Sequence, residues 1–375
     1  MSVPTRRAGL AMVVLLGVSA CGGEPTVGTP VSSSGVSPAA PSSAASSAWK
    51  RQPEIKVDDA RFGFGDRVGD EIWVSGTAKG AAVVFVFDAE TRELKETVTK
   101  SKNSLAAADN VNAIAVTASA VFLDTGAGNL HGIDRATHEV AVYRQLPAAK
   151  DGAKPGKPVS TRDGKAAYVA VGETVYELDK ADGTPVRTFT LSNPGVTVPS
   201  GSTTDYRLLG VAGGLVWYGA VVKTTPLSGP PVYDRLLTLD PASGAVKPFQ
   251  VKADGTILGP ETVGDKVVFS YLNTLWVVDP RSGEARELPK TRLAARAEAS
   301  SLKDVDGLST YGDEVALIDE GLIELVDLGG GASTLVPSEC DVPKPEFGAC
   351  VYGDVVMADD SLWAITPSAL VVFTR

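Results

Sequence analysis

The sequence predicts an all-β fold, a seven-bladed β-propeller of four-stranded blades. The first observation is a short apolar strand that ends in Asp and precedes a turn, and its copies are spaced by 46, 45, 61, 39, 48 and 39 residues. A repeat of about 40 to 50 residues made of short strands is typical of propellers. The second observation is that 39 Gly and 24 Pro accompany 43% hydrophobic residues, which fits a turn-rich fold with a large core. The copies end at Asp88, Asp134, Asp179, Asp240, Asp279 and Asp327, with a degenerate seventh at Thr366.

Each repeat contains four segments suited to strands. They are rich in Val, Ile, Leu, Tyr and Phe, and Gly, Asp, Asn and Ser fill the gaps between them. In the second repeat these segments are Val111–Thr117, Ala120–Asp124, Asn129–Asp134 and Val140–Gln145. The expected second strands of the other repeats are Glu71–Val74, Ala167–Ala170, Leu215–Tyr218, Val267–Ser270, Val315–Ile318 and Val355–Met357.

The recurring Asp has a local explanation in the turn that follows each strand. Ser or Thr stands three residues after the Asp in most copies, often with Gly next. Asp accepts backbone N–H bonds across such a turn, and Gly supplies the positive φ. Repeated copies of one turn are not repeated active sites. We therefore predict a structural role for Asp88, Asp134, Asp179, Asp240 and Asp279.

The form apolar-x-apolar-Asp-x-x-Ser/Thr-Gly resembles the repeats of the pyrroloquinoline-quinone-type, or quinoprotein-like, propeller superfamily. The resemblance covers residues 55–375 and concerns architecture. That superfamily includes quinone-dependent alcohol dehydrogenases, and also many lipoproteins without a cofactor. The enzymes carry a Trp at a set position after the Gly of each blade, and no such Trp follows Gly183, Gly244 or Gly283. Seven blades are also one fewer than the usual eight of these enzymes, so we expect no quinone or other cofactor.

Residues 1–20 have the features of a lipoprotein signal peptide. Two arginines precede the uncharged apolar segment Ala8–Val18, whose 11 residues are fewer than the roughly 20 of a membrane-spanning helix. Leu15–Gly23 resembles the lipobox of bacterial lipoproteins, in which the cysteine, here Cys21, is lipidated and becomes the new N-terminus. An ordinary secretory signal cleaved after Ala20 is the alternative. The sequence does not separate general secretion from twin-arginine export.

Residues 21–49 are expected to form a lipidated, disordered linker, and residues 50–375 the propeller domain. The linker is rich in Ser, Pro and Gly, has one charge, Glu24, and has no aromatic residue before Trp49. Such a composition buries too little apolar area to offset the entropy lost on ordering. Without its leader the chain has 33 basic and 45 acidic side chains. Acyl chains rather than charge would therefore hold it to the bilayer, at the extracytoplasmic face of the cell membrane.

The long connections are predicted to share one face of the propeller. In this architecture the links from the fourth strand of one blade to the first of the next (D–A) lie on the same face as the B–C loops. The A–B and C–D turns lie on the other face. Long loops on a rigid scaffold are candidate functional elements, and neutral drift in loop length is the alternative explanation. The long segments are the D–A links Ser101–Asn110, Pro147–Pro158, Ser192–Asp205, Lys290–Asp306 and Pro337–Phe347, and the B–C loop Lys223–Val232.

Cys340 and Cys350 are the two cysteines other than Cys21. With Cys21 lipidated, only these two thiols remain in an oxidising compartment, and we expect them to form a disulfide. Closing a loop of this size stabilises the fold by about 2–3 kcal/mol. Metal binding by two cysteines alone is disfavoured, and so is a redox role without a Cys-x-x-Cys spacing.

The sequence offers few candidates for catalysis or metal binding. The two histidines, His131 and His138, flank one predicted turn, and no Gly-x-Ser-x-Gly motif accompanies them. Asp304–Gly307 is similar to the start of a calcium loop but lacks the terminal Glu. We predict no metal site, with calcium in a loop or in the central channel as the open alternative. Sequence order does not show which residues line the channel, so any catalytic residues stay unknown.

Two classes of function fit these observations. A formal charge of −10 argues against a nucleic-acid partner. The first class is a monomeric, non-catalytic binding or scaffold protein that engages a protein or cell-envelope ligand through its B–C and D–A loops. The alternative is an extracytoplasmic hydrolase or lyase that acts on a glycan or peptide with carboxylates near the channel. Carboxylates of perturbed pKa in the channel would favour the enzyme, and a flat apolar or aromatic patch would favour the binding protein.

Overall fold

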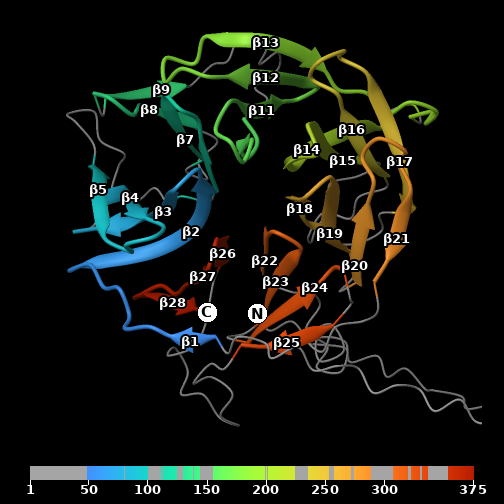
Figure 1. Ribbon diagram of the computed structural model, residues 1–375. Coiled ribbons are helices and arrows are strands. Elements are labelled where there is room, and N and C mark those ends of the chain that lie inside the picture. Colours follow the sequence, from blue (N-terminus) through green and yellow to red (C-terminus); the bar gives the residue numbers. More distant parts are fainter. Residues whose placement is uncertain are drawn as a thin grey trace, which may run out of the picture. The chain divides into compact units, whose positions relative to one another are not determined.

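The described residues form seven four-stranded antiparallel sheets, arranged as blades around a common centre (Figure 1). The predicted seven-bladed, all-β propeller is therefore confirmed. No helix in the described part of the chain is long and apolar enough to cross a membrane. The computed structural model describes residues 49–79, 81–99, 111, 113–124, 130–137, 139–143, 155–198, 200, 202–223, 235–252, 257–271, 274–288, 307–319, 322–329, 332–336 and 354–375.

In blades 1 to 6 the strands run in chain order from the innermost strand, A, to the outermost, D. Blade 1 consists of β2 (Ala60–Val68), β3 (Glu71–Ala78), β4 (Ala81–Asp88) and β5 (Leu94–Thr99). Blade 2 consists of β6 (Ala113–Val116), β7 (Ala120–Asp124), β8 (Leu130–Asp134) and β9 (Val140–Tyr143). Blade 3 consists of β10 (Val159–Ser160), β11 (Ala167–Val171), β12 (Thr174–Leu178) and β13 (Pro185–Thr190).

The next three blades follow the same order. Blade 4 consists of β14 (Thr203–Ala212), β15 (Leu215–Lys223), β16 (Arg235–Leu239) and β17 (Val246–Lys252). Blade 5 consists of β18 (Ile257–Val263), β19 (Lys266–Tyr271), β20 (Thr274–Val278) and β21 (Ala285–Glu287). Blade 6 consists of β22 (Gly307–Tyr311), β23 (Glu314–Asp319), β24 (Leu322–Asp327) and β25 (Ser333–Leu335). Most residues of the predicted long D–A links and of the long B–C loop lie outside the described residues, and the strands on either side of them are the expected ones; the link predicted as Ser192–Asp205 ends earlier, because β14 begins at Thr203.

Seven hydrophobic clusters fill the seven interfaces between neighbouring blades. Strand β4 shows how one strand serves two of them, because successive side chains of a strand point to opposite faces of the sheet. Val83, Phe85 and Phe87 pack against blade 7. The alternate residues Ala82, Val84 and Val86 pack against blade 2. A strand covered on both faces must be apolar throughout, which explains the continuous runs of Val, Ile, Leu and Phe in the sequence.

Blade 7 is closed by a strand from the other end of the chain. It consists of β26 (Asp354–Ala358), β27 (Ser361–Ile365), β28 (Leu370–Thr374) and, outermost, β1 (Lys50–Arg51). Lys50 pairs with Thr374, and the pairing continues where Ile55 N–H donates to Leu370 O at 2.9 Å. Trp49 packs into the cluster between blades 6 and 7, and the Arg375 guanidinium lies 4.7 Å from the centre of its ring.

The sequence interpretation of the seventh repeat is wrong by one strand. Val355–Met357, expected in a second strand, lies in the innermost strand β26, and Thr366 follows the second strand β27. Thr366 Oγ1 accepts a hydrogen bond from Ala369 N–H in the B–C turn. The physical reason is that β1 supplies the outer strand, so only three strands remain for the end of the chain. The spacing of Thr366 from Asp327 lies within the range of the repeat and conceals the shift.

The C–D turns confirm the structural role predicted for the recurring Asp. The carboxylates of Asp88, Asp134, Asp240 and Asp279 each accept a backbone N–H bond from two residues ahead. The bond from Thr91 N–H, at 2.8 Å, is the main cause that lowers the pKa of Asp88. Asp179 differs, because its Oδ1 accepts a hydrogen bond from Ser119 of blade 2 at 3.1 Å.

Arg92 provides a test of this turn geometry. It occupies the position that Gly holds in other C–D turns and has a φ of 66°, against 73° for Gly244. A left-handed conformation costs about 1–2 kcal/mol for a residue with a side chain, and the entropy that Gly loses on folding offsets about 0.5–1 kcal/mol of the gain. We expect Arg92→Gly to raise the free energy of unfolding by about 0.5–1 kcal/mol in urea titrations of the full chain. The matched variant Gly244→Arg should lower it, and an Arg92→Gly chain no more stable than the parent would contradict the turn assignment.

Candidate functional site

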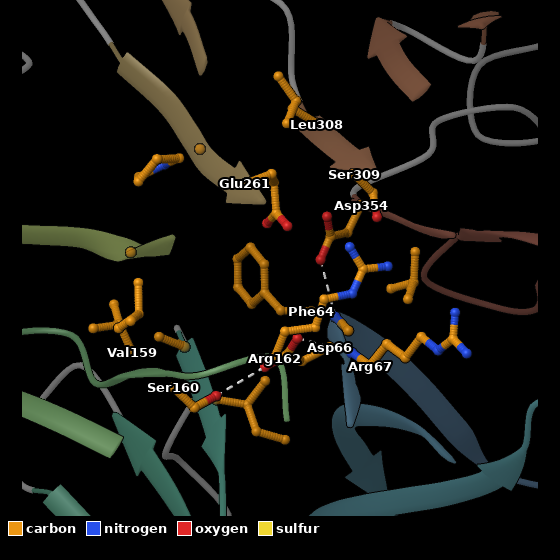
Figure 2. Close-up of a pocket in the computed structure, with 18 of the residues that line it drawn as sticks. Phe64, Asp66, Arg67, Val159, Ser160, Arg162, Glu261, Leu308, Ser309 and Asp354 are labelled. Carbon is orange, nitrogen blue, oxygen red and sulfur yellow. Dashed lines mark hydrogen bonds between the residues drawn. The ribbon is translucent and has the colours of Figure 1, made fainter. Parts of the chain in front are cut away.

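The first strands of the seven blades enclose a central cavity of about 300 Å³ (Figure 2). Residues of β2, β6, β10, β14, β18, β22 and β26 all line it. This volume is at the small end of the range for ligand pockets, roughly 300–1,000 Å³. Its charged lining residues are Asp66, Arg67, Lys157, Arg162, Glu261 and Asp354.

Three of the inner strands carry a β-bulge where they line the cavity. The bulges lie between Phe62 and Gly65 in β2, within β14 after Leu208, and between Leu258 and Glu261 in β18. In β2 a glycine is required, because a Cβ atom on Gly65 would lie 2.4 Å from Ile365 Cδ1. Bulges redirect side chains and are frequent beside functional sites.

The bulge in β2 presents Phe64 to the cavity. The buried Ser75 fixes this backbone, since its Oγ accepts from Phe64 N–H at 2.9 Å and donates to Phe64 O at 3.0 Å. The Phe64 ring projects into the cavity (Figure 2), and the residue is 40% exposed. An aromatic face thus lies beside three carboxyl groups.

Asp66 and Asp354 use their carboxyl oxygens to join blades. Asp354 Oδ2 accepts from Gly65 N–H of blade 1 at 2.9 Å, and its Oδ1 accepts from its neighbour Val355 N–H at 2.9 Å. Asp66 Oδ2 accepts from the hydroxyl of Ser160 in blade 3 at 3.1 Å, and its Oδ1 accepts from the following amide. Burial is the main cause that raises the pKa of each carboxyl to about 6.

Glu261 faces the cavity, and its carboxyl forms no hydrogen bond or ion pair with any residue that the structure describes (Figure 2). Burial raises its pKa to about 8; the charge of Arg162 opposes this rise, and the charges of Asp66 and Asp354 add to it. At pH 7 Glu261 is therefore largely protonated, whereas Asp66 and Asp354 are largely ionised. The three carboxyl groups thus fall into two protonation states in one small cavity.

Arg162 lies across the end of the cavity that is toward the A–B turns. It stands in the six-residue turn 161–166 of blade 3 and reaches across to blades 5 and 6. Its guanidinium donates to Thr310 O at 2.6 Å, to Thr310 Oγ1 at 3.1 Å and to Thr262 O at 3.3 Å. Arg162 also lines a separate pocket among the A–B turns, with Tyr311 and Gly312. Arg67, Arg162 and Thr262 line both spaces, so these residues lie where that pocket adjoins the central cavity.

A groove of about 650 Å³ adjoins the cavity on the opposite face. It is lined by residues of the D–A links, the B–C turn of blade 3 and the beginnings of β14 and β18, among them Tyr206 and Arg207. The groove and the cavity share Lys157, Leu209 and Gly259 as lining residues. The two spaces are therefore contiguous, on the face where the sequence places its long connections.

The residues singled out from sequence do not form this site. Cys21, Cys340, Cys350, His138 and residues 304–306 of the calcium-loop-like segment lie outside the described residues, as do the leader and most of the linker. His131 lies in β8, is buried, and does not line the cavity. Within the described ranges, no group of three or more His, Cys, Asp or Glu side chains is arranged to hold a metal ion. The disulfide, the lipidation and a loop calcium site stay predictions.

The cavity residues Asp66, Arg162, Glu261 and Asp354 were not identified from the sequence. One available signal was a glycine near an acidic residue inside a first strand, as in Gly65-Asp66 and Gly259-Pro260-Glu261, since an isolated Gly in a strand indicates a bulge. The other was the length of the turn that carries Arg162, because the remaining A–B turns have two or three residues.

No protein-family model and no curated protein matches the chain. A functional assignment therefore has to come from the chemistry of the cavity and of the groove beside it.

The raised pKa of Glu261 predicts a pH dependence of stability. The Glu261 carboxyl ionises near pH 4.5 in the unfolded chain and near pH 8 in the folded one. Through this group the protein therefore loses stability as the pH rises between these two values, and the group causes no further loss at higher pH. We expect Glu261→Gln to remove this loss and to be more stable than the parent at pH 9, by on the order of 2–4 kcal/mol, with little difference at pH 4. Urea titrations across this range measure it.

The matched control is Glu287→Gln, which alters an exposed carboxyl on β21 of the same blade. Its stability should follow that of the parent at every pH. Parallel curves for Glu261→Gln and the parent would show that the Glu261 carboxyl is solvated rather than buried.

Proposed function

We propose that the protein is a lipid-anchored, extracytoplasmic binding propeller that engages a protein or cell-envelope ligand through its D–A and B–C face. The observation that carries this proposal is the groove of about 650 Å³ on that face, which continues into the central cavity. At the opposite end Arg162 lies across the axis and is held by Thr262 and Thr310, so the groove side is the one we propose for ligand entry.

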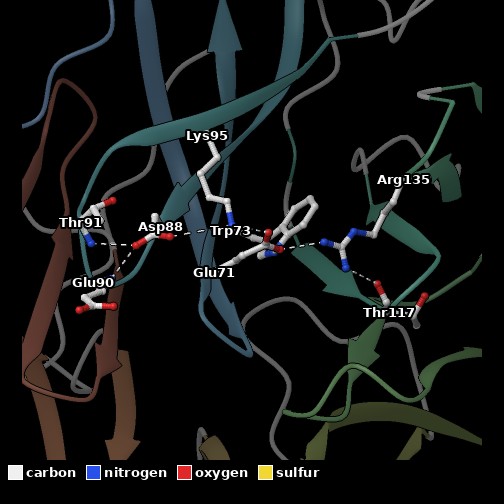
Figure 3. A network of polar contacts seen from close by, with 8 residues as sticks. All are labelled: Glu71, Trp73, Asp88, Glu90, Thr91, Lys95, Thr117 and Arg135. Carbon is white, nitrogen blue, oxygen red and sulfur yellow. Dashed lines mark hydrogen bonds and ion pairs between the residues drawn. The ribbon is translucent and has the colours of Figure 1, made fainter.

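The opposite face supports the proposal by its use of polar groups. Between blades 1 and 2, Glu71 accepts from Lys95 at 3.1 Å and from Arg135 at 2.8 Å (Figure 3). Arg135 also donates to Thr117 O, and its guanidinium lies 4.5 Å from the centre of the Trp73 ring. Side chains here are occupied by contacts between blades, which suits a scaffold surface. In the groove Arg207 pairs with Asp205 at 3.2 Å, and the exposed Lys157 has no ion pair with another described residue.

Membrane attachment and family rest on sequence features. The lipobox-like segment before Cys21 supports lipidation, and the resemblance to quinoprotein-like repeats supports membership of a superfamily that includes lipoproteins without a cofactor. The strand that follows the linker, β1, is the outer strand of blade 7. A lipid anchor on this linker would thus be joined directly to the strand that closes the ring, and we propose a monomer for the folded domain.

Photo-cross-linking from two lysines of blade 3 tests the binding face. A photoreactive residue replaces either Lys157, exposed in the groove, or Lys180, exposed in the C–D turn on the opposite face. In the lipidated full chain within its own membrane, we expect one defined adduct from position 157 and none from 180, identified by mass spectrometry. Arg207→Glu, which reverses a charge in the groove, should reduce the adduct several-fold. Equal adducts from both positions, or none from either, would overturn the proposal.

A hydrolase or lyase that acts on a glycan or peptide is the second candidate, and the divided pKa values favour it. A protonated Glu261 beside ionised Asp66 and Asp354 is the pattern of a general acid and a general base. Against it, both carboxyl oxygens of Asp354 and of Asp66 already accept hydrogen bonds that hold the backbone or a neighbouring blade. We therefore expect no turnover of cell-wall glycan or peptide mixtures; turnover that Glu261→Gln abolishes would place the enzyme first.

A further inference from the structure

We propose that the central cavity binds an organic cation, an alkyl ammonium or guanidinium group, between the Phe64 ring and the Glu261 carboxyl. The group can come from a free amine or from a lysine or arginine side chain of a larger ligand. This inference deepens the proposed function, because the cavity opens from the groove and the cation would be the part of the ligand that enters it.

The first support is the exposure of Phe64 inside the cavity. Phe62, two residues earlier, packs in the cluster between blades 7 and 1, whereas Phe64 belongs to none of the seven clusters. The bulge and its two bonds to Ser75 hold the backbone of Phe64 so that the ring lies in the cavity and stays 40% exposed (Figure 2). A ring face exposed beside carboxyl groups is a favourable surface for a cation.

The second support is the absence of a partner for Glu261. The charged groups around it are Asp66 and Arg67 on β2, Lys157 before β10, Arg162 in the A–B turn of blade 3 and Asp354 on β26. The nearby guanidinium groups are held elsewhere. Arg162 donates to Thr262 and Thr310 at the A–B end of the cavity.

Arg67 is likewise engaged outside the centre of the cavity. It pairs with Asp359 at 2.7 Å and lies over the Tyr311 ring. Within the described part of the chain, no lysine or arginine therefore forms an ion pair with Asp66, Glu261 or Asp354. A bound cation would restore the ionised form of Glu261, whose pKa is raised by burial and by its acidic neighbours.

The arrangement favours an organic cation over a metal ion. The described residues bring no three acidic side chains close enough to share one ion, and calcium requires six to eight oxygens at about 2.3–2.6 Å. An alkyl ammonium distributes its charge over three N–H donors and offers CH₂ groups to the ring. A volume of about 300 Å³ accommodates a short alkyl amine.

Isothermal titration of the full chain in detergent tests the proposal. The probes are n-butylamine and butylguanidine as cations, 1-butanol as the uncharged analogue, butyrate as the anion, and CaCl₂. We expect a 1:1 isotherm for at least one organic cation and none for butanol or butyrate. The association constant should rise between pH 6 and pH 9, because binding favours the ionised Glu261.

Three variants locate the binding site. Glu261→Gln should weaken binding at least about 10-fold at pH 9 and flatten the pH profile, because it removes the carboxylate. Phe64→Leu keeps an apolar side chain but removes the ring face, so it should weaken binding about 5-fold. Glu287→Gln is the matched surface control and should leave binding unchanged. Equal affinity in the parent and in Glu261→Gln, or tight binding of Ca²⁺ in place of both amines, would overturn the proposal.

A lysine-containing pentapeptide separates the two sources of the cation. If the group belongs to a larger ligand, the peptide should bind more tightly than butylamine, and Arg207→Glu should affect the peptide alone. If the natural ligand is a free amine, butylamine should bind as well as the peptide, and the groove variant should affect neither. Cation binding without any groove adduct would reject the proposed binding face and leave the cavity inference standing. A groove adduct without cation binding would reject only the cavity inference.

Discussion

Closure of the ring by polar side chains of the innermost strands is the constraint on which the rest of the structure depends. Apolar clusters join each blade to its neighbours, but they are not directional and do not fix the distance of a sheet from the axis. Hydrogen bonds between inner strands and A–B turns are directional, and they fix the distance of each sheet from the axis. They join Asp66 to Ser160, Ser160 to Val116, Gly65 to Asp354, Met357 to Ser309, Thr310 to Thr262 and Thr262 to Gly213. Every blade takes part, so the axis is necessarily lined with hydroxyl and carboxyl groups.

Because of this constraint, the three carboxyl groups of the cavity have different roles. Asp66 and Asp354 each hold another blade through one oxygen and their own backbone through the other, so their charge is part of the framework. Glu261 lies among them without a hydrogen bond, and the framework charges raise its pKa further. A glutamate that served closure alone would be bonded as the two aspartates are. The difference in bonding, rather than the acidity of the cavity, is what identifies Glu261 as the group available to a ligand.

The sequence predicts those structural features that arise from residues close together in the chain, and it does not predict those that arise from residues far apart. Asp240 and Ser243 are three residues apart and make their hydrogen bond within one turn, so spacing alone predicted the structure. The second strands of blades 1 to 6 follow from short apolar runs with turn residues on both sides. The contact between Gly65 and Asp354 joins residues 289 positions apart. The displaced seventh repeat has the same origin, because β1 completes blade 7 across the whole chain, and no periodic pattern contains that pairing.

Blade 3 departs from the repeat in the length of its A–B turn. Six A–B turns have two or three residues, and the turn of blade 3 has six. The extra residues fold against blades 1 and 2, where Gly164 O accepts from Ala118 N–H at 2.9 Å, and a Cβ on Gly164 would lie 2.6 Å from Val68 Cγ1. This packing aims Arg162 at Thr310 across the axis. The inner strands all run from the D–A face to the A–B face, so the two ends of the channel differ, and Arg162 lies across the A–B end, opposite the entrance on the D–A face. That entrance adjoins the groove, so a ligand held by the loop face and a group held at the axis belong to one continuous site.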